Sequence, residues 1–289
     1  MHGIFLPLNN HSLWYLGLGA LSLSLLSYVY FKTKNVRCLY LFLAMVGLGY
    51  AIEYCIYVLL ESYVYEPRIL ARDPYYDNNM GAIFSNFLTL PATATFIAAF
   101  SLNWMWVPVF AAFVAGIEWL FLELDIYHQR WWRLWYTAGG LLFYYNVARV
   151  WFQCMRWPLQ GFLHSMILFF ITWAFTTMHF LSISLFNSRY YQLGWFDSRS
   201  HDTTAFSSLF WIVSSIFFVW MLKRRWEVTW LKYIVPALVI FGANLILQMI
   251  GILHILKWWD YLYCIGASVI MLLIADAISK RLRNGPAKI

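Results

Sequence analysis

Runs of about 20 apolar residues recur along almost the whole chain, and they restrict it to one class of fold. A helix that crosses a lipid bilayer needs about 20 predominantly apolar residues. The 289-residue sequence is 62% hydrophobic and only 11% charged, whereas a soluble domain is about half apolar and about a quarter charged. We therefore expect an all-α, polytopic integral membrane bundle whose main partner is the lipid bilayer.

Nine segments meet this length rule. Two neighbours are separated only by "SLNW" and one segment is short, so eight or ten spans are the alternatives. The first segment has no basic lead-in and is too long for a signal peptide, so we expect it to be retained. No linker or charge block divides the chain, which indicates a single transmembrane domain over residues 1–289. The nine segments are residues 12–31, 38–60, 81–101, 104–124, 134–155, 160–185, 206–222, 229–253 and 260–279.

Basic residues cluster after the first, seventh and last segments, at 32–37, 223–225 and 280–288. Nine spans place all three clusters on one side, and the positive-inside rule makes that side cytoplasmic. The N-terminus is then outside and the C-terminus inside. Arg130 and Arg133 are the exceptions, because they fall on the outer side. This distribution accounts for the net charge of +7 without a nucleic-acid partner. We expect a plasma membrane location.

Four polar residues lie at similar depth in four different segments. By helix rise, Glu53, Glu118 and His179 each lie roughly 10 Å below the outer ends of their segments, and Asn86 lies at a similar level. A charged side chain at the centre of a bilayer costs about 2.5–3.5 kcal/mol on insertion scales, so such residues mark functional sites by default. We expect the first three around one polar pocket, as candidates for proton transfer or catalysis. The alternative is structural hydrogen bonding between helices.

A second set of residues extends from this level to the outer lip. Asp125 lies seven residues after Glu118, on the same helix face two turns away. His128 lies three residues after Asp125 and can touch it if the helix continues. A carboxylate–imidazole pair there could pass a proton inward or bind a ligand. The alternative is that both residues are simply water-exposed ends.

The fifth segment carries a polar stripe toward its inner end. Asn146, Arg149, Gln153 and Arg156 follow one another at helical spacing and share one face. We expect this face to point into protein or into an inner aqueous cavity, where Asn146 and Arg149 could bind a phosphate or lipid headgroup. The alternative is that Arg149 extends its head to the inner interface.

Motifs of several common enzyme classes are absent. The sequence has no phosphate-binding loop, no zinc-protease motif and no nucleophile elbow. Its seven histidines are scattered, and its four cysteines are neither paired nor at metal-binding spacing. We expect neither a metal site nor a cofactor.

The stretch from "NNMGAIFSNFLTLPATATFIAAF" through "GIEWLFLELDIYHQRWW" to "FYYNVARVW" resembles a family of uncharacterised multi-pass membrane proteins from endospore-forming bacteria. The similarity covers roughly residues 78–157. It departs from the family at "LDIYHQRWW", where a Gly usually precedes the Trp. That family has no established activity, so the resemblance implies a bacterial plasma membrane and no particular chemistry. The matching positions are Pro91–Thr93, Glu118, Tyr127, Trp131, Trp132, Asn146 and Arg149.

Three functions remain open. The first is proton- or cation-linked transport of a small molecule, for which Pro91 and Pro108 offer helix breaks. The second is an enzyme that uses a neutral carboxylic acid on a lipid or isoprenoid substrate. The third is a non-catalytic assembly or interaction protein. Transporters are often built from repeats, but the echo between "YAIEYCIYVLLE" at 50–61 and "AGIEWLFLELDI" at 115–126 is short enough to arise by chance.

Overall fold

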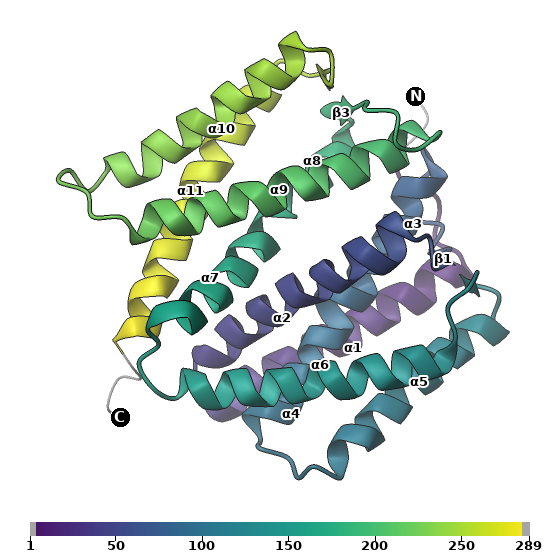
Figure 1. Cartoon of the computed structure of the whole chain (residues 1–289). Coiled ribbons are helices and arrows are strands. Elements are labelled where there is room, and N and C mark those ends of the chain that lie inside the picture. Colours follow the sequence, from purple (N-terminus) through teal and green to yellow (C-terminus); the bar gives the residue numbers. More distant parts are fainter. Residues whose placement is uncertain (1–3, 285–289) are drawn as a thin grey trace. The chain divides into compact units, whose positions relative to one another are not determined.

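The computed structural model describes residues 4–284, and most of this part of the chain is helical (Figure 1). Lys288, in the last basic cluster, lies outside the described residues. The helices, with two π-helical segments η1 and η2, are α1 (Asn10–Thr33), α2 (Arg37–Glu53), η1 (Tyr54–Leu59), α3 (Pro74–Ala82), η2 (Ile83–Thr89), α4 (Leu90–Ala99), α5 (Trp106–Glu123), α6 (Leu134–Met155), α7 (Gly161–Thr176), α8 (His179–Phe186), α9 (Arg199–Lys223), α10 (Leu231–Met249) and α11 (Asp260–Arg283).

Eight helical segments in the described part are long and apolar enough to cross a bilayer, which confirms the helical multi-pass class. Three of them are composite: Arg37–Leu59 joins α2 to η1, Pro74–Ala99 joins α3, η2 and α4, and Gly161–Phe186 joins α7 to α8. The segment expected at 134–155 is a helix, α6, but it is not among the eight. Its 22 residues are long enough, so its polar residues, Arg149 among them, are what lower its hydropathy.

The chain forms two compact units, Met1–Trp157 and Pro158–Ile289. In the first unit α4 packs against α1, α2 and α6, and α5 packs against α6. In the second unit α7 packs against α9 and α11, and α10 packs against α11. The core of the second unit includes Leu168, Phe218 and Leu272, all nearly or fully buried.

Each unit contains a pair of three-residue strands in the loops at one end of its helices. In the first unit β1 (Tyr63–Tyr65) pairs antiparallel with β2 (Tyr127–Gln129). In the second unit β3 (Arg189–Tyr191) pairs antiparallel with β4 (Leu253–Ile255). Each strand begins two residues after a residue in the left-handed conformation, and these four are Glu61, Asp125, Asn187 and Gly251.

The two units therefore repeat one pattern of helix, left-handed residue, strand and helix. Ser62 accepts backbone hydrogen bonds from Arg130 and Trp132, and Ser188, 126 positions later, accepts them from Leu256 and Lys257. Both strands of one unit thus match those of the other at the same spacing. This repeat is far longer than the echo noted between residues 50–61 and 115–126.

A carboxylate organises the loop after the first strand in both units. Asp77 accepts the backbone N–H groups of residues 68, 69 and 70 at 2.7–2.9 Å. Asp202 accepts those of residues 193, 194 and 195 at 2.6–3.0 Å. Three charge-assisted hydrogen bonds at one side chain fix each loop, because ionised acceptors form the stronger bonds. The expected spans at 81–101 and 206–222 began too late for this reason: α3 and α9 start at these polar, buried turns.

Candidate functional site

The first unit encloses a cavity of about 150 Å³ that we call the Glu53–Glu118 cavity. Its walls come from α1, α2, η1, η2, α5 and α6 and from both strands of the first unit. Glu53, Asn86 and Glu118 all line it, so three of the four residues predicted at one depth reach the same space. The rest of the lining is mostly apolar and aromatic, which is the usual composition of a small-molecule site with a few orienting polar groups.

Glu53 is the most deeply placed charge-bearing group of the cavity, since only 7% of the residue is exposed. The hydroxyl of Tyr63 donates a hydrogen bond to its Oε1. Its Oε2 is fully buried and has no hydrogen-bond partner among residues 4–284. The same holds for Nδ2 of Asn86, on a residue that is 3% exposed. Asn86 is close enough for its amide to interact with the Glu53 carboxylate, but neither atom makes a regular hydrogen bond within residues 4–284. A buried polar atom without such a bond costs about 1–3 kcal/mol, so both atoms can gain from a bound ligand or water.

Glu118 approaches the cavity from α5. It is half-buried, and Nε2 of Gln129 on β2 donates to its Oε1 at 2.9 Å. The carboxylate is thereby oriented by the strand pair, while Glu53 is oriented through Tyr63 on the other strand. One short sheet thus positions both acids.

Two π-helical segments border the cavity. Segment η1 begins directly after Glu53, and η2 contains Ser85, Asn86 and Thr89, all of which line the cavity. The extra residue in a π-turn leaves backbone groups without regular partners, and such turns are frequent at functional sites. In η2 the hydroxyl of Thr89 donates to the Phe84 carbonyl at 2.8 Å. The proline expected to break the third span, Pro91, lies just beyond η2 and cannot donate a backbone hydrogen bond.

Tyrosines from the strands form the wall opposite the helices. The rings of Tyr63, Tyr65 and Tyr127 lie 5.1–5.5 Å apart, and Trp132 packs at 5.7 Å on Tyr63. Burial raises the pKa of all three phenols far above the usual value, and the nearby charge of Glu53 raises each further. These hydroxyls are therefore protonated at neutral pH and can act as donors toward carboxylates.

Among the described residues that line the cavity, no cationic side chain balances the two acids. The described residues that line the cavity include no Lys, Arg or His. Within residues 4–284 no group of three His, Cys, Asp or Glu side chains is arranged to hold a metal ion. Two carboxylates in one apolar cavity can be neutralised only by protons or by a bound cation.

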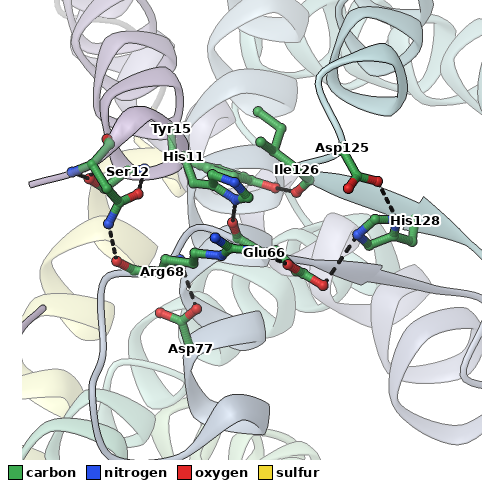
Figure 2. A network of polar contacts seen from close by, with 10 residues as sticks. His11, Ser12, Tyr15, Glu66, Arg68, Asp77, Asp125, Ile126 and His128 are labelled. Atoms are coloured by element: carbon green, nitrogen blue, oxygen red, sulfur yellow. Dashed lines mark hydrogen bonds and ion pairs between the residues drawn. The ribbon is translucent and has the colours of Figure 1, made fainter.

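Asp125 and His128 do not line the cavity. They belong to a polar network with Glu66 (Figure 2). Helix α5 ends at Glu123, so the expected continuous helix is absent, yet the turn still brings His128 Nδ1 to 3.6 Å from Asp125 Oδ1. His128 Nε2 lies 3.2 Å from Glu66 Oε1. The side chain of Asp125 is 89% exposed, as in the alternative that assigned it to water.

The lip is tied to the cavity through Tyr15. Its hydroxyl donates to the Ile126 carbonyl at 2.8 Å (Figure 2), and Tyr15 also lines the cavity. Next to it, His11 Nδ1 lies 2.9 Å from the Glu66 carbonyl. Helix α1 is therefore fastened to both strand-bearing loops of the first unit.

His179 belongs to the second unit and is not among the residues that line the cavity. Its ring stacks on Trp211 with centroids 4.2 Å apart and an interplanar angle of 5°. The expectation that it would share a pocket with the two glutamates arose from depth alone. Depth does not say which helices are neighbours.

The polar stripe of α6 does not reach the cavity either. Asn146, Gln153 and Arg156 are exposed and Arg149 is half-buried, so of the two expected surroundings, protein or an inner aqueous cavity, protein does not cover this face. Asn146 Nδ2 donates to the Leu142 carbonyl of its own helix, and Arg156 donates to Ser101. Local partners satisfy these groups without a ligand.

Tyr63, Tyr65, Gln129 and Trp132 were missed by the sequence reasoning. They lie on strands and loops, outside the helical periodicity that revealed the acids. For Tyr63 and Tyr65 the available signal was their place in a long, polar and aromatic segment at residues 61–79.

Compared with models of protein families, with curated proteins and with solved structures, the chain gives no match. The resemblance over residues 78–157 to membrane proteins of endospore-forming bacteria stays a prediction.

Proposed function

We propose that the protein transports a small molecule across a bacterial plasma membrane, coupled to protons or another cation, through the Glu53–Glu118 cavity. The observation that carries this proposal is the Oε2 atom of Glu53, which is buried, without a hydrogen-bond partner in the described structure, and next to a cavity that Glu118 shares. A helical membrane protein that keeps two acids in one apolar cavity has a group that can gain or lose a proton when a ligand enters.

The π-helical segments support movement at this site. Transporters commonly interrupt their helices where substrate and coupling ions bind, because irregular backbone is tolerated only where it lines a cavity. Both η1 and η2 meet the cavity, and the regular helices α2 and α4 adjoin them. The repeat of strands and left-handed residues in the two units also fits the repeated construction of many transporters.

For the topology we propose nine spans, with α6 as the ninth. Its 22 residues extend about 33 Å, and α4 and α5 pack along it. The basic residues at 32–37, 223–225 and 280–283 then lie in the cytoplasm, and the paired strands face outside.

The test is charge movement in proteoliposomes on a solid-supported membrane, recorded during concentration jumps of cationic, neutral and anionic solutes. We expect at least one class to produce a transient current in the wild-type protein. Glu53→Gln and Glu118→Gln should each reduce that current by about tenfold or more, because each removes a titratable group from the cavity. Asp125→Asn is the matched control, since this acid is exposed and outside the cavity.

The other functions give different results. An enzyme acting on a lipid would convert its substrate in nanodiscs with no solute-dependent current, and Glu53→Gln would abolish turnover. An assembly protein would show neither current nor turnover, and both glutamine variants would retain its interactions. A current that survives in both variants would contradict the assignment of these acids.

A further inference from the structure

The second unit has a buried arginine, Arg189, at a position that corresponds in sequence to the lining of the cavity in the first unit. Positions 126 residues apart correspond in the two strand pairs, so Tyr63 matches Arg189 and Tyr65 matches Tyr191. Glu118 on α5 and Asn244 on α10 are also 126 residues apart, and each lies at the same spacing before the strand that follows its helix, β2 or β4. Arg189 is buried, and its Nη1 donates to Asn244 Oδ1 at 2.6 Å and to the Tyr191 hydroxyl at 3.1 Å. A guanidinium thus lies between the counterparts of Glu118 and Tyr65.

The counter-charge of this guanidinium comes from a different position. Arg189 Nε donates at 2.8 Å to Asp260, the first residue of α11, which is fully buried. The matching residue of the first unit is Leu134. The second unit therefore holds its own cation with its own acid, and its site is closed within the protein.

The first unit has the complementary arrangement. Its acid lies at Glu118, where the second unit has the neutral Asn244, and a tyrosine replaces the arginine. The space between Tyr65 and Glu118 belongs to the cavity. No cationic side chain is among the described residues that line it, and Glu53 Oε2 has no partner within residues 4–284. The first unit thus places two acids and several aromatic rings around this space, with no cationic side chain among its described lining residues.

We propose that the Glu53–Glu118 cavity binds a small organic monocation, namely a protonated amine or a guanidinium attached to a compact apolar group. The carboxylates would accept its N–H groups, and the faces of Tyr65, Tyr127 and Trp132 would attract its charge, as aromatic rings do for organic cations. This rests on the proposed function only in taking the cavity as a ligand site.

The volume of the cavity limits the size of the apolar group that the bound cation can carry. A protein cavity of about 150 Å³ accommodates a single benzene molecule, and the Glu53–Glu118 cavity has about this volume. Benzylammonium joins one phenyl ring to one ammonium group and is the natural probe. Benzyl alcohol has the same shape without charge, and benzoate reverses the charge.

The experiment is calorimetric titration of benzylammonium into the full chain in phosphatidylcholine nanodiscs, at neutral pH and moderate salt. We expect binding at least tenfold tighter than that of benzyl alcohol, and no binding of benzoate. Glu118→Gln should weaken binding by about tenfold or more, since a hydrogen bond to a charged group is lost. Asp125→Asn should leave binding unchanged.

A gain-of-cation variant tests the correspondence between the units. Tyr63→Arg places a guanidinium where Arg189 stands in the second unit, so it should occupy the cavity and abolish benzylammonium binding in a protein that still folds. If that variant fails to fold, Glu118→Gln decides alone.

Three results would each overturn the proposal. They are equal affinity for benzylammonium and benzyl alcohol, unchanged affinity in Glu118→Gln, and complete competition by sodium at equal concentration. Binding without any solute-driven current would instead reject transport and leave the cation site standing.

Discussion

Glu53 and His179 occupy the same position in the two units. Glu53 lies ten residues before the first residue of β1, and His179 lies ten residues before the first residue of β3. Both are buried polar side chains beside an interruption of a helix. In the first unit the side chain borders a cavity, and in the second it is covered by the flat face of Trp211. One architecture therefore supports an open polar site and a closed one.

We expect His179→Phe to keep or slightly raise the stability of the protein. The ring already stacks on Trp211, and its Nε2 has no hydrogen-bond partner in the described residues. A phenyl ring retains the stacking and removes a buried polar atom that costs about 1–3 kcal/mol when unsatisfied. Arg189→Met is the contrasting variant, because it leaves the buried Asp260 without its cation and should cost about 3–5 kcal/mol. Thermal unfolding in detergent measures both. A large loss of stability in His179→Phe would mean that the imidazole binds something the second unit needs.

Gly81→Ala should destabilise the first unit strongly. A Cβ atom at this position would collide with Cβ of Tyr65 and would lie 2.8 Å from Cγ of the same residue. Helix α3 can approach β1 so closely only without a side chain. Gly116→Ala is the matched control, since nothing lies within 4 Å of a Cβ built there. The unfolding midpoint should fall by several degrees in the first variant and stay unchanged or rise in the second. Similar midpoints in both variants would contradict the close packing of α3 on the strand.

The tyrosine wall predicts a loss of stability in alkali. An unfolded tyrosine ionises near pH 10, whereas burial first, and then the neighbouring acid Glu53, raises the pKa of Tyr63, Tyr65 and Tyr127 in the folded protein. The folded state therefore binds more protons above about pH 10, so stability is complete below that pH and falls as the pH rises. Each phenol contributes up to about 1.4 kcal/mol per pH unit.

The unfolding midpoint between pH 8 and pH 11.5 measures this effect. Tyr127→Phe should make the decline less steep, because one buried phenol is removed. If the midpoint stays level over this range, or falls equally steeply in Tyr127→Phe, these hydroxyls are not buried in the folded protein.

The topology is tested by labelling single cysteines in intact cells after the four natural cysteines have been replaced. Lys34 follows α1 and is exposed, and Asp125 is exposed beside β2. We expect Asp125→Cys to react with an impermeant maleimide from outside and Lys34→Cys to react only after the membrane is opened. The reverse pattern would invert the orientation.

The helical part of this architecture follows closely from apolar segment length. The expected spans at 12–31 and 134–155 correspond to α1 and α6, because a long apolar or mixed run has no other stable form in lipid. The buried polar starts of α3 and α9 could not be anticipated in this way. Their carboxylates, Asp77 and Asp202, accept hydrogen bonds from the backbone of the preceding loops, and no sequence periodicity indicates those contacts. The four short strands were also outside the reach of pattern reasoning, since three residues carry too little alternation.

The candidate site was partly accessible from the sequence. The cost of burying charge singled out Glu53 and Glu118, and depth placed Asn86 with them. Depth could not exclude His179, and helical spacing could not include Tyr63 or Tyr127. The correspondence between Glu118 and Asn244 became visible only when both strand registers were known.

The central claim, that the first unit holds an accessible cavity favouring cations, is tested most directly at Ser85. This residue lines the cavity from η2, and Ser85→Cys changes one atom in a background without other cysteines. The rates of reaction with aminoethyl and sulfonatoethyl methanethiosulfonate are measured and divided by the rates with a free thiol. The account predicts that the cationic reagent reacts at least about tenfold faster, and that Glu118→Gln in the same chain removes most of this preference. Equal corrected rates, or a cysteine that neither reagent reaches, would contradict it.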